Sequence, residues 1–368
     1  MTNLGRFNFF WTTSDLAGRS TAVMAASAKG RGMRTENQRR KFLKALGLAM
    51  ASPLFSQVGH ASENDWVLGF GSCMDQRKSQ RFWTHLLRQR HDHFVFLGDN
   101  LYPSRDNLPE LQVAYEDLSR NSGLRALTTR VGVSAVWDDH DFGADNADSS
   151  LPYRSESQTL FRNFWKQEYA TENDGVYSSK MFRHEGKLIH LILLDTRFHR
   201  TPYQLVDSLE NNNENADSQL LGKAQWQWLE EQMRKSADVK IIGSSIQVLS
   251  AEHRFEKWSN YPAEYDRLIQ LIEGCRAPCL ILSGDRHQHE ISRLELRDGR
   301  VLYDFTSSGL NKAEGLSRFE KNRLRVQRHL DDGFGEVRLR FSGSELNVTM
   351  TMIDKRGRVC FTQQDLLL

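Results

Sequence analysis

The sequence predicts a layered α/β domain with two central sheets, helices on their outer faces and antiparallel strands at the C-terminal end. From Trp66 onward, short apolar runs alternate with segments whose apolar residues recur at helical spacing. Several of the runs are nearly continuous in Val, Ile and Leu, which is typical of strands covered on both faces. After residue 300 only strand-like runs follow, and this change predicts the closing antiparallel strands.

The expected elements follow in chain order. Strands are predicted at 66–73, 93–100, 130–141, 187–197, 239–249 and 278–289. Helices are predicted between them at 79–90, 108–120, 223–236 and 262–274. The C-terminal strands are expected at 301–308, 334–341, 346–354 and 359–364. A helical, loop-rich insert at about 150–172 and an acidic, Asn-rich loop at 206–220 interrupt the pattern.

Composition excludes some function classes. The 368 residues include 49 basic and 47 acidic side chains, which gives a net charge of +2. This balance offers no basic patch for nucleic acid or for a membrane surface, and we expect a monomer. Four cysteines are too few for a disulfide-built fold. The sequence leaves open whether Cys275 and Cys279 form a short-loop disulfide or remain two free thiols.

The first 61 residues read as an export segment. Residues 38–57 are "QRRKFLKALGLAMASPLFSQ", in which a pair of arginines precedes a short, weakly apolar run. This pattern is typical of a twin-arginine signal, and the run is too short to span a bilayer. We therefore expect a natural start at Met33, recognition by the twin-arginine export machinery, and a periplasmic or extracellular domain over 62–368. The alternative is a cytosolic amphipathic helix.

Polar side chains gather where the predicted strands end. Because the carboxyl ends of strands in an α/β sheet form the rim where ligands bind, these side chains are candidates for one site. The candidates are Cys73; Asp99, Asn100 and Tyr102; Asp138, Asp139, His140 and Asp141; and Asp285, His287 and His289.

The number of carboxylates favours a metal site. Unpaired carboxylates at one rim repel each other and raise one another's pKa, and a multivalent cation removes that cost. Two metal ions that share a carboxylate are a recurring device for hydrolysing phosphate esters. Taken singly, each motif has a simpler explanation: a Gly-Asp turn, a helix cap, or a buried Cys73 that acts as a small apolar residue.

The motif order Gly-Ser-Cys, Gly-Asp-Asn-x-Tyr, Trp-Asp-Asp-His-Asp and Gly-Asp-Arg-His resembles the PhoD-like (alkaline phosphatase D) family of metallophosphatases. These are relatives of the calcineurin-like phosphoesterases, and the resemblance covers about Trp66 to Asp354. It implies a four-layered αββα fold, hydrolysis of phosphate esters and a dinuclear centre. It also implies Fe3+ and Ca2+ in that centre, with zinc and manganese left open.

The resemblance also implies roles for individual residues. The metal ligands would be Cys73, Asp99 in the bridging position, Tyr102, Asp139, Asp285 and His287. His140 would contact the phosphate and assist the leaving group. Arg197 would either reach the phosphate or form an ion pair with Asp195 or a neighbour. Asn100, Asn146 and Gln247 are possible contacts to metal or substrate, and Asp138 and His289 would orient ligands.

Three functions follow from these residues. The leading one is a phosphoesterase in which a metal-bound hydroxide attacks a phosphate monoester or diester. The second is a metal-free serine esterase that uses Ser72, although the chain lacks a G-x-S-x-G elbow there. The third is a protein that binds metal or phosphate without turnover. The native substrate is left open.

Overall fold

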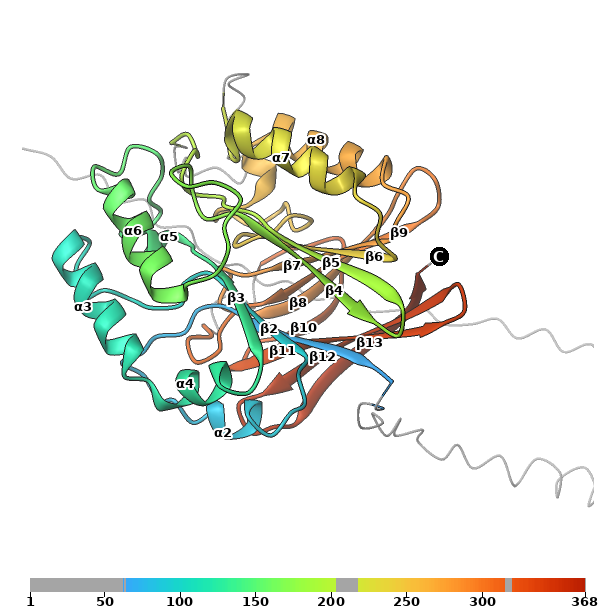
Figure 1. Cartoon of the computed structure of the whole chain (residues 1–368), viewed down its shortest axis with the longest axis horizontal. Helices are drawn as coiled ribbons and strands as arrows, with labels where there is room; N and C mark the ends of the chain where they lie inside the picture. Colours follow the sequence, from blue (N-terminus) through green and yellow to red (C-terminus); the bar gives the residue numbers. More distant parts are fainter. Residues whose placement is uncertain (1–61, 63, 203–217, 315–319, 368) are drawn as a thin grey trace, which may run out of the picture. The chain divides into compact units, whose positions relative to one another are not determined.

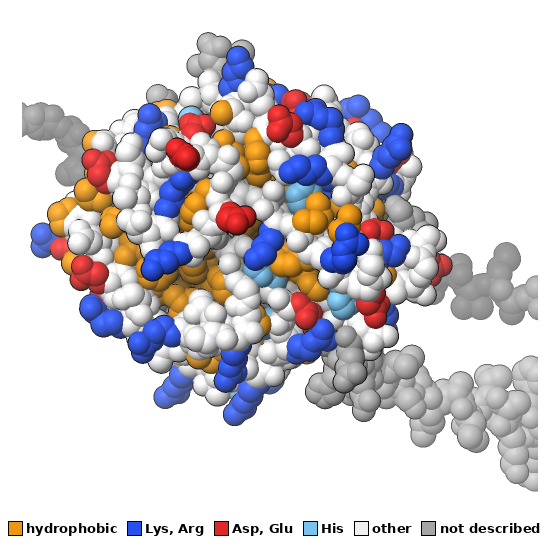
Figure 2. Space-filling model, in the orientation of Figure 1, with side chains coloured by type: hydrophobic (Ala, Val, Ile, Leu, Met, Phe, Trp, Pro, Cys, Tyr) orange, Lys and Arg blue, Asp and Glu red, His pale blue; other side chains and the backbone are white. Residues whose placement is uncertain are grey.

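This computed structural model describes residues 62, 64–202, 218–314 and 320–367. The predicted export segment and most of the acidic loop lie outside the described residues. Two sheets form the centre of the described domain, and no described helix is long and apolar enough to cross a membrane. Figure 2 shows basic side chains spread among acidic and apolar ones on the visible face, and they do not gather in one patch there.

The first sheet has six strands in the order β13-β12-β11-β1-β2-β3. Its parallel half begins with β1, to which β2 and then β3 are added. Its antiparallel half is β11, β12 and β13, and β11 pairs with β1. The bounds are Trp66–Gly71 for β1, His93–Leu97 for β2, Gly132–Val136 for β3, Gly333–Ser342 for β11, Glu345–Asp354 for β12 and Val359–Leu367 for β13.

The second sheet has seven strands in the order β10-β8-β9-β7-β6-β5-β4. Strands β5, β6, β7 and β9 are parallel, and β4, β8 and β10 pair antiparallel with their neighbours. The bounds are Ser178–His184 for β4, Lys187–Leu193 for β5, Val239–Gly243 for β6, Cys279–Ser283 for β7, His289–Glu295 for β8, Val301–Ser307 for β9 and Arg325–His329 for β10.

Helices cover the outer face of each sheet (Figure 1), so the layers follow the order helix, sheet, sheet, helix. Helices α7 and α8 lie over the second sheet, whereas α3 and α6 lie beside the first. The bounds are Trp83–Leu86 for α2, Leu108–Ser119 for α3, Ser122–Thr128 for α4, Asp139–Phe142 for α5, Arg154–Trp165 for α6, Gly222–Arg234 for α7, Trp258–Asn260 for the 3-10 turn η1 and Pro262–Glu273 for α8.

Strand β5 shows why the apolar runs are continuous. Leu191 and Leu193 point into the core between the two sheets, whereas Ile192 and Leu194 pack against the helices outside. Successive side chains of a strand face opposite sides, so a strand with a core on each side needs apolar residues at every position. The predicted four-layered αββα fold is confirmed.

The structure corrects several predicted elements. The run at 301–308 is β9, which lies parallel to β7 in the second sheet and does not belong to the C-terminal antiparallel strands. Strands β4 and β10 and helix α4 were not expected, and the run at 278–289 contains β7 and only the start of β8. The predicted helix at 79–90 shrinks to Trp83–Leu86, because turn bonds such as Arg88 N–H to the His85 carbonyl (3.1 Å) replace helical ones after it.

The two sheets meet at the ends of their parallel strands. Ser72, just after β1, forms a β-bridge with Ser308, just after β9. The amide of Cys73 donates to the Gly98 carbonyl (3.3 Å), which ties the end of β1 to the end of β2. These links bring the strand ends of both sheets to one place.

Candidate metal centre

Asp99 lies at the centre of the predicted site. Two groups of side chains have possible ligand atoms within 4.8 Å of one another, and both groups contain Asp99. The first group is Cys73, Asp99 and His287, and the second is Asp99, Asp139 and His140. Among the described residues, a carboxylate shared by two possible ligand groups is compatible with a pair of neighbouring metal ions.

The backbone at this rim adopts conformations that most residues avoid. Among the described residues, seven non-glycine residues have positive φ, and five of these belong to the predicted site. They are Cys73 (φ 57), Asp99 (φ 50), Asn146 (φ 55), Asp285 (φ 65) and His287 (φ 51). A left-handed backbone at a residue with a Cβ costs on the order of 1–3 kcal/mol, so its concentration here indicates a functional constraint.

Asp99 is buried and closely contacted by neighbouring candidate ligands. Its Oδ2 accepts a hydrogen bond from the Tyr102 hydroxyl at 2.6 Å and lies 3.5 Å from the Cys73 Sγ. Its Oδ1 accepts from the amide of His140 at 3.4 Å. Burial and the nearby Asp139 raise the pKa of Asp99 well above its ordinary value. Without a cation, this site therefore holds a carboxyl group that resists ionisation.

Cys73 supplies the sulfur of the first group. Its Sγ is fully buried, 3.1 Å from the Ser308 hydroxyl and 3.8 Å from the Asp285 carbonyl. Burial raises the pKa of the thiol to about 11, and the Ser308 hydrogen bond opposes that rise. A bound metal ion deprotonates a coordinating thiol outright, so the same burial is compatible with a thiolate ligand.

Asp285 and His287 both follow β7. The Oδ2 of Asp285 is buried and accepts no hydrogen bond from the described residues. Burial is the main reason that the pKa of Asp285 rises to about 7. The Nδ1 of His287 lies 2.5 Å from the Lys312 carbonyl, which orients the ring and leaves Nε2 to face a metal ion. Burial lowers the pKa of His287 to about 4, so the ring is neutral, the form that binds metals.

Asp139 is the first residue of helix α5, and each of its carboxylate oxygens accepts a backbone hydrogen bond. Its Oδ1 accepts from the His140 amide at 3.0 Å and its Oδ2 from the Asn146 amide at 2.7 Å. Burial alone would raise the pKa of Asp139, but the charges of His140 and Arg197, together with the hydrogen bond from the Asn146 amide and a contact with Asp99, hold it below its ordinary value. Asn146 thus contacts a candidate ligand through its backbone, while its side chain donates to Asp145 at 2.7 Å.

Arg197 forms buried ion pairs and does not itself line the cavity, although its partner Glu256 does. Its side chain is fully buried; Nε donates to the Asp138 Oδ1 at 2.6 Å, and Nη2 pairs with Glu256. Asp138 also accepts from the Ser245 hydroxyl at 2.7 Å. Of the two alternatives for Arg197, the ion pair with a neighbour describes this geometry, and the neighbours are Asp138 and Glu256. Asp138 thereby links the loops after β3, β5 and β6.

Three other candidates lie outside the cavity lining. Gln247 donates to Glu290 (2.8 Å) and Thr306 (2.7 Å). The side chain of Asn100 donates to the Val136 carbonyl at 2.9 Å, which ties β2 to β3. His289 lies 3.2 Å from the Ser307 hydroxyl and is fully buried. The contacts to metal or substrate expected of Gln247 and Asn100, and the ligand-orienting role expected of His289, stay predictions.

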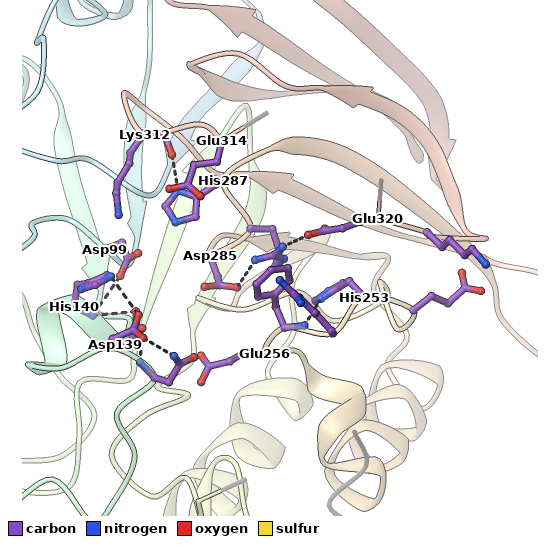
Figure 3. A pocket seen from close by; sticks show the side chains of 17 residues that line it. Asp99, Asp139, His140, His253, Glu256, Asp285, His287, Lys312, Glu314 and Glu320 are labelled. Atoms are coloured by element: carbon purple, nitrogen blue, oxygen red, sulfur yellow. Dashed lines mark hydrogen bonds and ion pairs between the residues drawn. The ribbon is translucent and has the colours of Figure 1, made fainter. Parts of the chain in front are cut away.

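The candidate ligands open onto a cavity of about 690 Å³ (Figure 3). Asp99, Asp139, His140, Asp285 and His287 line it, and Cys73 and Tyr102 lie behind them. The sequence did not indicate several other lining residues, namely Glu252, His253, Arg254, Phe255, Glu256, Arg286, Lys312, Glu314, Glu320 and Lys321. They come largely from connecting segments, which carry no strand-end signal.

Lys312 is the most informative of the unexpected residues. Its Nζ lies 3.6 Å from the centroid of the Tyr102 ring, and its carbonyl orients His287. An ammonium group over an aromatic face is held by cation–π attraction and keeps its charge. This part of the cavity therefore combines a cation with the carboxylates.

The donor set fits a pair of metal ions. Sulfur, phenol oxygen, imidazole nitrogen and carboxylate oxygens converge, and Asp99 belongs to both groups. The Oδ2 of Asp285 lies 3.8 Å from the Arg286 guanidinium but accepts no hydrogen bond from the described residues, so it is a further buried acceptor for a metal ion. Such mixed sites accept several metals, so the donor set does not select one.

Comparisons with known proteins identify the family and the fold. The family described as PhoD-like phosphatase matches residues 68–350. A solved structure of PhoD is similar, with a TM-score of 0.65 and 16% identity over 83% of this chain and 73% of that chain. A purple acid phosphatase, PPD1 from yellow lupin (Lupinus luteus) seeds, has a TM-score of 0.57 and 8% identity over 82% of this chain and 54% of its own. At these identities the two structures show the shared fold. No match was found among curated proteins.

Proposed function

The chain belongs to the PhoD-like phosphatase family and is a hydrolase of phosphoric esters, and we propose that two metal ions sharing Asp99 carry its activity. The single observation behind this proposal is that one buried carboxylate belongs to both ligand groups. When bound, the two ions would supply positive charge for the phosphoryl oxygens and lower the pKa of a water molecule.

We assign the first ion to Cys73, Asp99, Tyr102 and His287. Ferric iron suits this set, because a phenol oxygen and a thiolate both stabilise a higher charge. The second ion, held by Asp99 and Asp139, has mainly oxygen donors, which suit calcium. Asp285 lies to the right of Asp99 and Asp139 and below His287 in Figure 3, and it provides a further carboxylate. The metals themselves are proposals, which elemental analysis of the purified protein would test.

His140 is the residue proposed to assist the leaving group. Its ring contacts Tyr102 with a centroid separation of 4.2 Å, and its Nε2 lies 3.9 Å from Asp145 Oδ1. These contacts hold the ring at the cavity wall, where its side chain keeps 19% of its exposure. A partly exposed imidazole in this position can donate a proton or a hydrogen bond to the departing oxygen.

Other side chains support the same reaction. The Lys312 ammonium adds positive charge beside Tyr102, where it can hold a phosphoryl oxygen. Asp138, fixed by Arg197 and Ser245, holds the loop that carries Asp139 and His140. We also propose that the protein works outside the cytoplasm after twin-arginine export, on the pattern in residues 38–57.

The serine esterase alternative loses its support. The Ser72 hydroxyl is fully buried and contacts the Cys73 Sγ (3.5 Å) and the Ser307 carbonyl (3.4 Å). Among the described residues, no histidine forms a hydrogen bond with Ser72, and Ser72 does not line the cavity. A nucleophile needs both a base and access to substrate.

The test is hydrolysis of p-nitrophenyl phosphate and bis-p-nitrophenyl phosphate, with elemental analysis of the same sample. We expect bound metal and cleavage of at least one ester, and loss of cleavage on prolonged chelation. Cleavage by fully metal-free protein would overturn the proposal. Metal without turnover on either ester would favour a binding protein.

A further inference from the structure

The cavity extends beyond the ligand groups to a second end. Figure 3 shows His253 and Glu320 on the side of Asp285 away from Asp99 and His140. We call this part, formed by residues 252–256 with Glu320 and Lys321, the distal end. A cavity of about 690 Å³ is large enough for a small organic ligand, so a phosphoryl group at the metal ligands leaves space for the alcohol portion of an ester.

Arg254 offers a charged group that no described carboxylate neutralises. Its guanidinium has no ion pair or hydrogen bond among the described residues, and its Cζ lies 5.1 Å from the centroid of the Phe255 ring. Phe255 is 37% exposed, and its ring also lies 3.8 Å from the Arg286 guanidinium. Because the ring holds Arg254 by cation–π attraction, the full positive charge remains available to a ligand.

His253 offers a second donor. Its Nδ1 accepts from the Phe255 amide at 3.3 Å, so the neutral ring carries its proton on Nε2. Burial, together with Arg286 and Lys257, lowers the pKa of His253 well below its usual range and keeps the ring neutral. The side chain is 2% exposed and lines the cavity, yet Nε2 has no hydrogen-bond partner among the described residues. A buried N–H without an acceptor costs on the order of 1–3 kcal/mol, which a ligand oxygen would recover.

At the distal end, more hydrogen-bond donors than acceptors lack a partner among the described residues. The ammonium of Lys321 has no ion pair among the described residues. In contrast, Glu320 pairs with Arg286 and accepts from the Gln288 amide at 3.1 Å, and Glu252 accepts from the Arg323 amide. Glu256, the third carboxylate of this end, pairs with Arg197 and Arg200. All three carboxylates thus have partners, whereas Arg254, His253 and Lys321 have unused donors.

We propose that the distal end binds an anionic group on the alcohol portion of the substrate. The preferred substrates are then phosphate esters whose leaving group carries a carboxylate or a second phosphate. This inference rests on the proposed function, because the metal ligands must hold the phosphoryl group that is cleaved. Arg254 and Lys321 would attract the anion, and the Nε2–H of His253 would donate to it.

Binding of phosphonates tests this inference without turnover, because the P–C bond resists ester hydrolysis. Calorimetry on the metal-loaded full chain would compare alkylphosphonates with ω-phosphonocarboxylates and α,ω-bisphosphonates over a series of chain lengths. We expect the doubly anionic ligand of at least one length to bind about tenfold more tightly than its singly anionic partner. The carboxylate and bisphosphonate series show which anion the distal end prefers.

Variants locate the effect. Arg254→Gln and Lys321→Gln should each remove much of the advantage and leave alkylphosphonate binding within about twofold, because exposed charge pairs act locally. The matched control is Arg276→Gln, which removes the same charge from an exposed residue outside the cavity lining and should change nothing.

Three results would overturn the inference: no advantage at any chain length, an advantage unchanged in both distal-end variants, or an equal loss in Arg276→Gln. Failure of the proposed function is a separate result. If the wild-type protein binds the doubly anionic ligands preferentially and cleaves neither nitrophenyl ester, the anion site stands and the assignment of turnover is wrong.

Discussion

The Tyr102 hydroxyl lies 2.6 Å from the Oδ2 of Asp99, the carboxylate that both ligand groups share. In the metal-free chain this contact is a hydrogen bond, and it raises the already high pKa of Tyr102 further. A metal ion between the two oxygens would replace that proton. The contact therefore places the phenol where a ligand to the shared carboxylate's ion is expected.

A variant of His140 can distinguish a role in catalysis from a role in metal binding. Its ring is close enough to Asp99 and Asp139 to act as a ligand, although we propose that it assists the leaving group. His140→Asn should lower kcat by about 10²–10⁴-fold and leave the metal content unchanged. Parallel assays of kcat and bound metal check this expectation, and loss of metal in the variant would instead identify His140 as a ligand.

Cys73 is predicted to be a ligand and not only a buried apolar residue. Cys73→Ser should lower metal content and activity at least about tenfold, because a hydroxyl is a much weaker ligand than a thiolate. The control is Cys360→Ser, which makes the same change in a partly buried strand residue outside the cavity. Unchanged metal content in Cys73→Ser would show that the sulfur is a packing residue.

Arg197 is predicted to stabilise the folded chain. Arg197→Met leaves the buried carboxylate of Asp138 without its cation and removes one of the two arginines that pair with Glu256, so the free energy of unfolding should fall by about 3–5 kcal/mol. Arg120→Met, which breaks an ion pair with Asp117 between two exposed side chains, should cost less than about 1 kcal/mol. Urea denaturation of both variants measures the difference, and similar values would contradict the structural role of Arg197.

The stability of the folded chain is expected to depend on pH through Asp304, which is not one of the candidate metal ligands. Burial is the largest cause that raises its pKa to about 6, from 3.8 in the unfolded chain. The folded chain therefore holds this proton more tightly, and the associated stability is present below pH 4 and is lost as pH rises through 6. The slope is at most about 1.4 kcal/mol per pH unit. Asp304→Asn should flatten the stability profile between these values, and an unchanged slope would rule out this origin.

The convergence of the candidate ligands could be predicted because they follow buried strands. Cys73, Asp99, Asp139 and His287 each come directly after or soon after an apolar run, and parallel strands place such positions at one edge. The order of those motifs was also specific enough to indicate the family. The near-continuous apolar runs predicted the layer order correctly, because a strand that is buried on both faces carries apolar residues on both.

Other features depend on tertiary contacts that no local pattern encodes. The composition of the 301–308 run does not show that this strand pairs in parallel with β7. A buried strand has a similar composition whether it pairs in parallel or antiparallel. Arg254, Phe255 and Lys312 lie in connections whose path is set by the surrounding fold. The partners of Arg197 lie 59 residues away on either side. The sequence therefore could not decide whether Arg197 contacts the substrate or forms a buried ion pair.

The most direct test of the shared-carboxylate centre is metal content and ester hydrolysis in Asp99→Asn, measured on one sample beside wild type and an Asp298→Asn surface control. We expect two metal ions per chain in wild type and in the control. In Asp99→Asn we expect loss of tight binding of both ions together with loss of hydrolysis. An Asp99→Asn protein that keeps both ions and its activity would contradict the account.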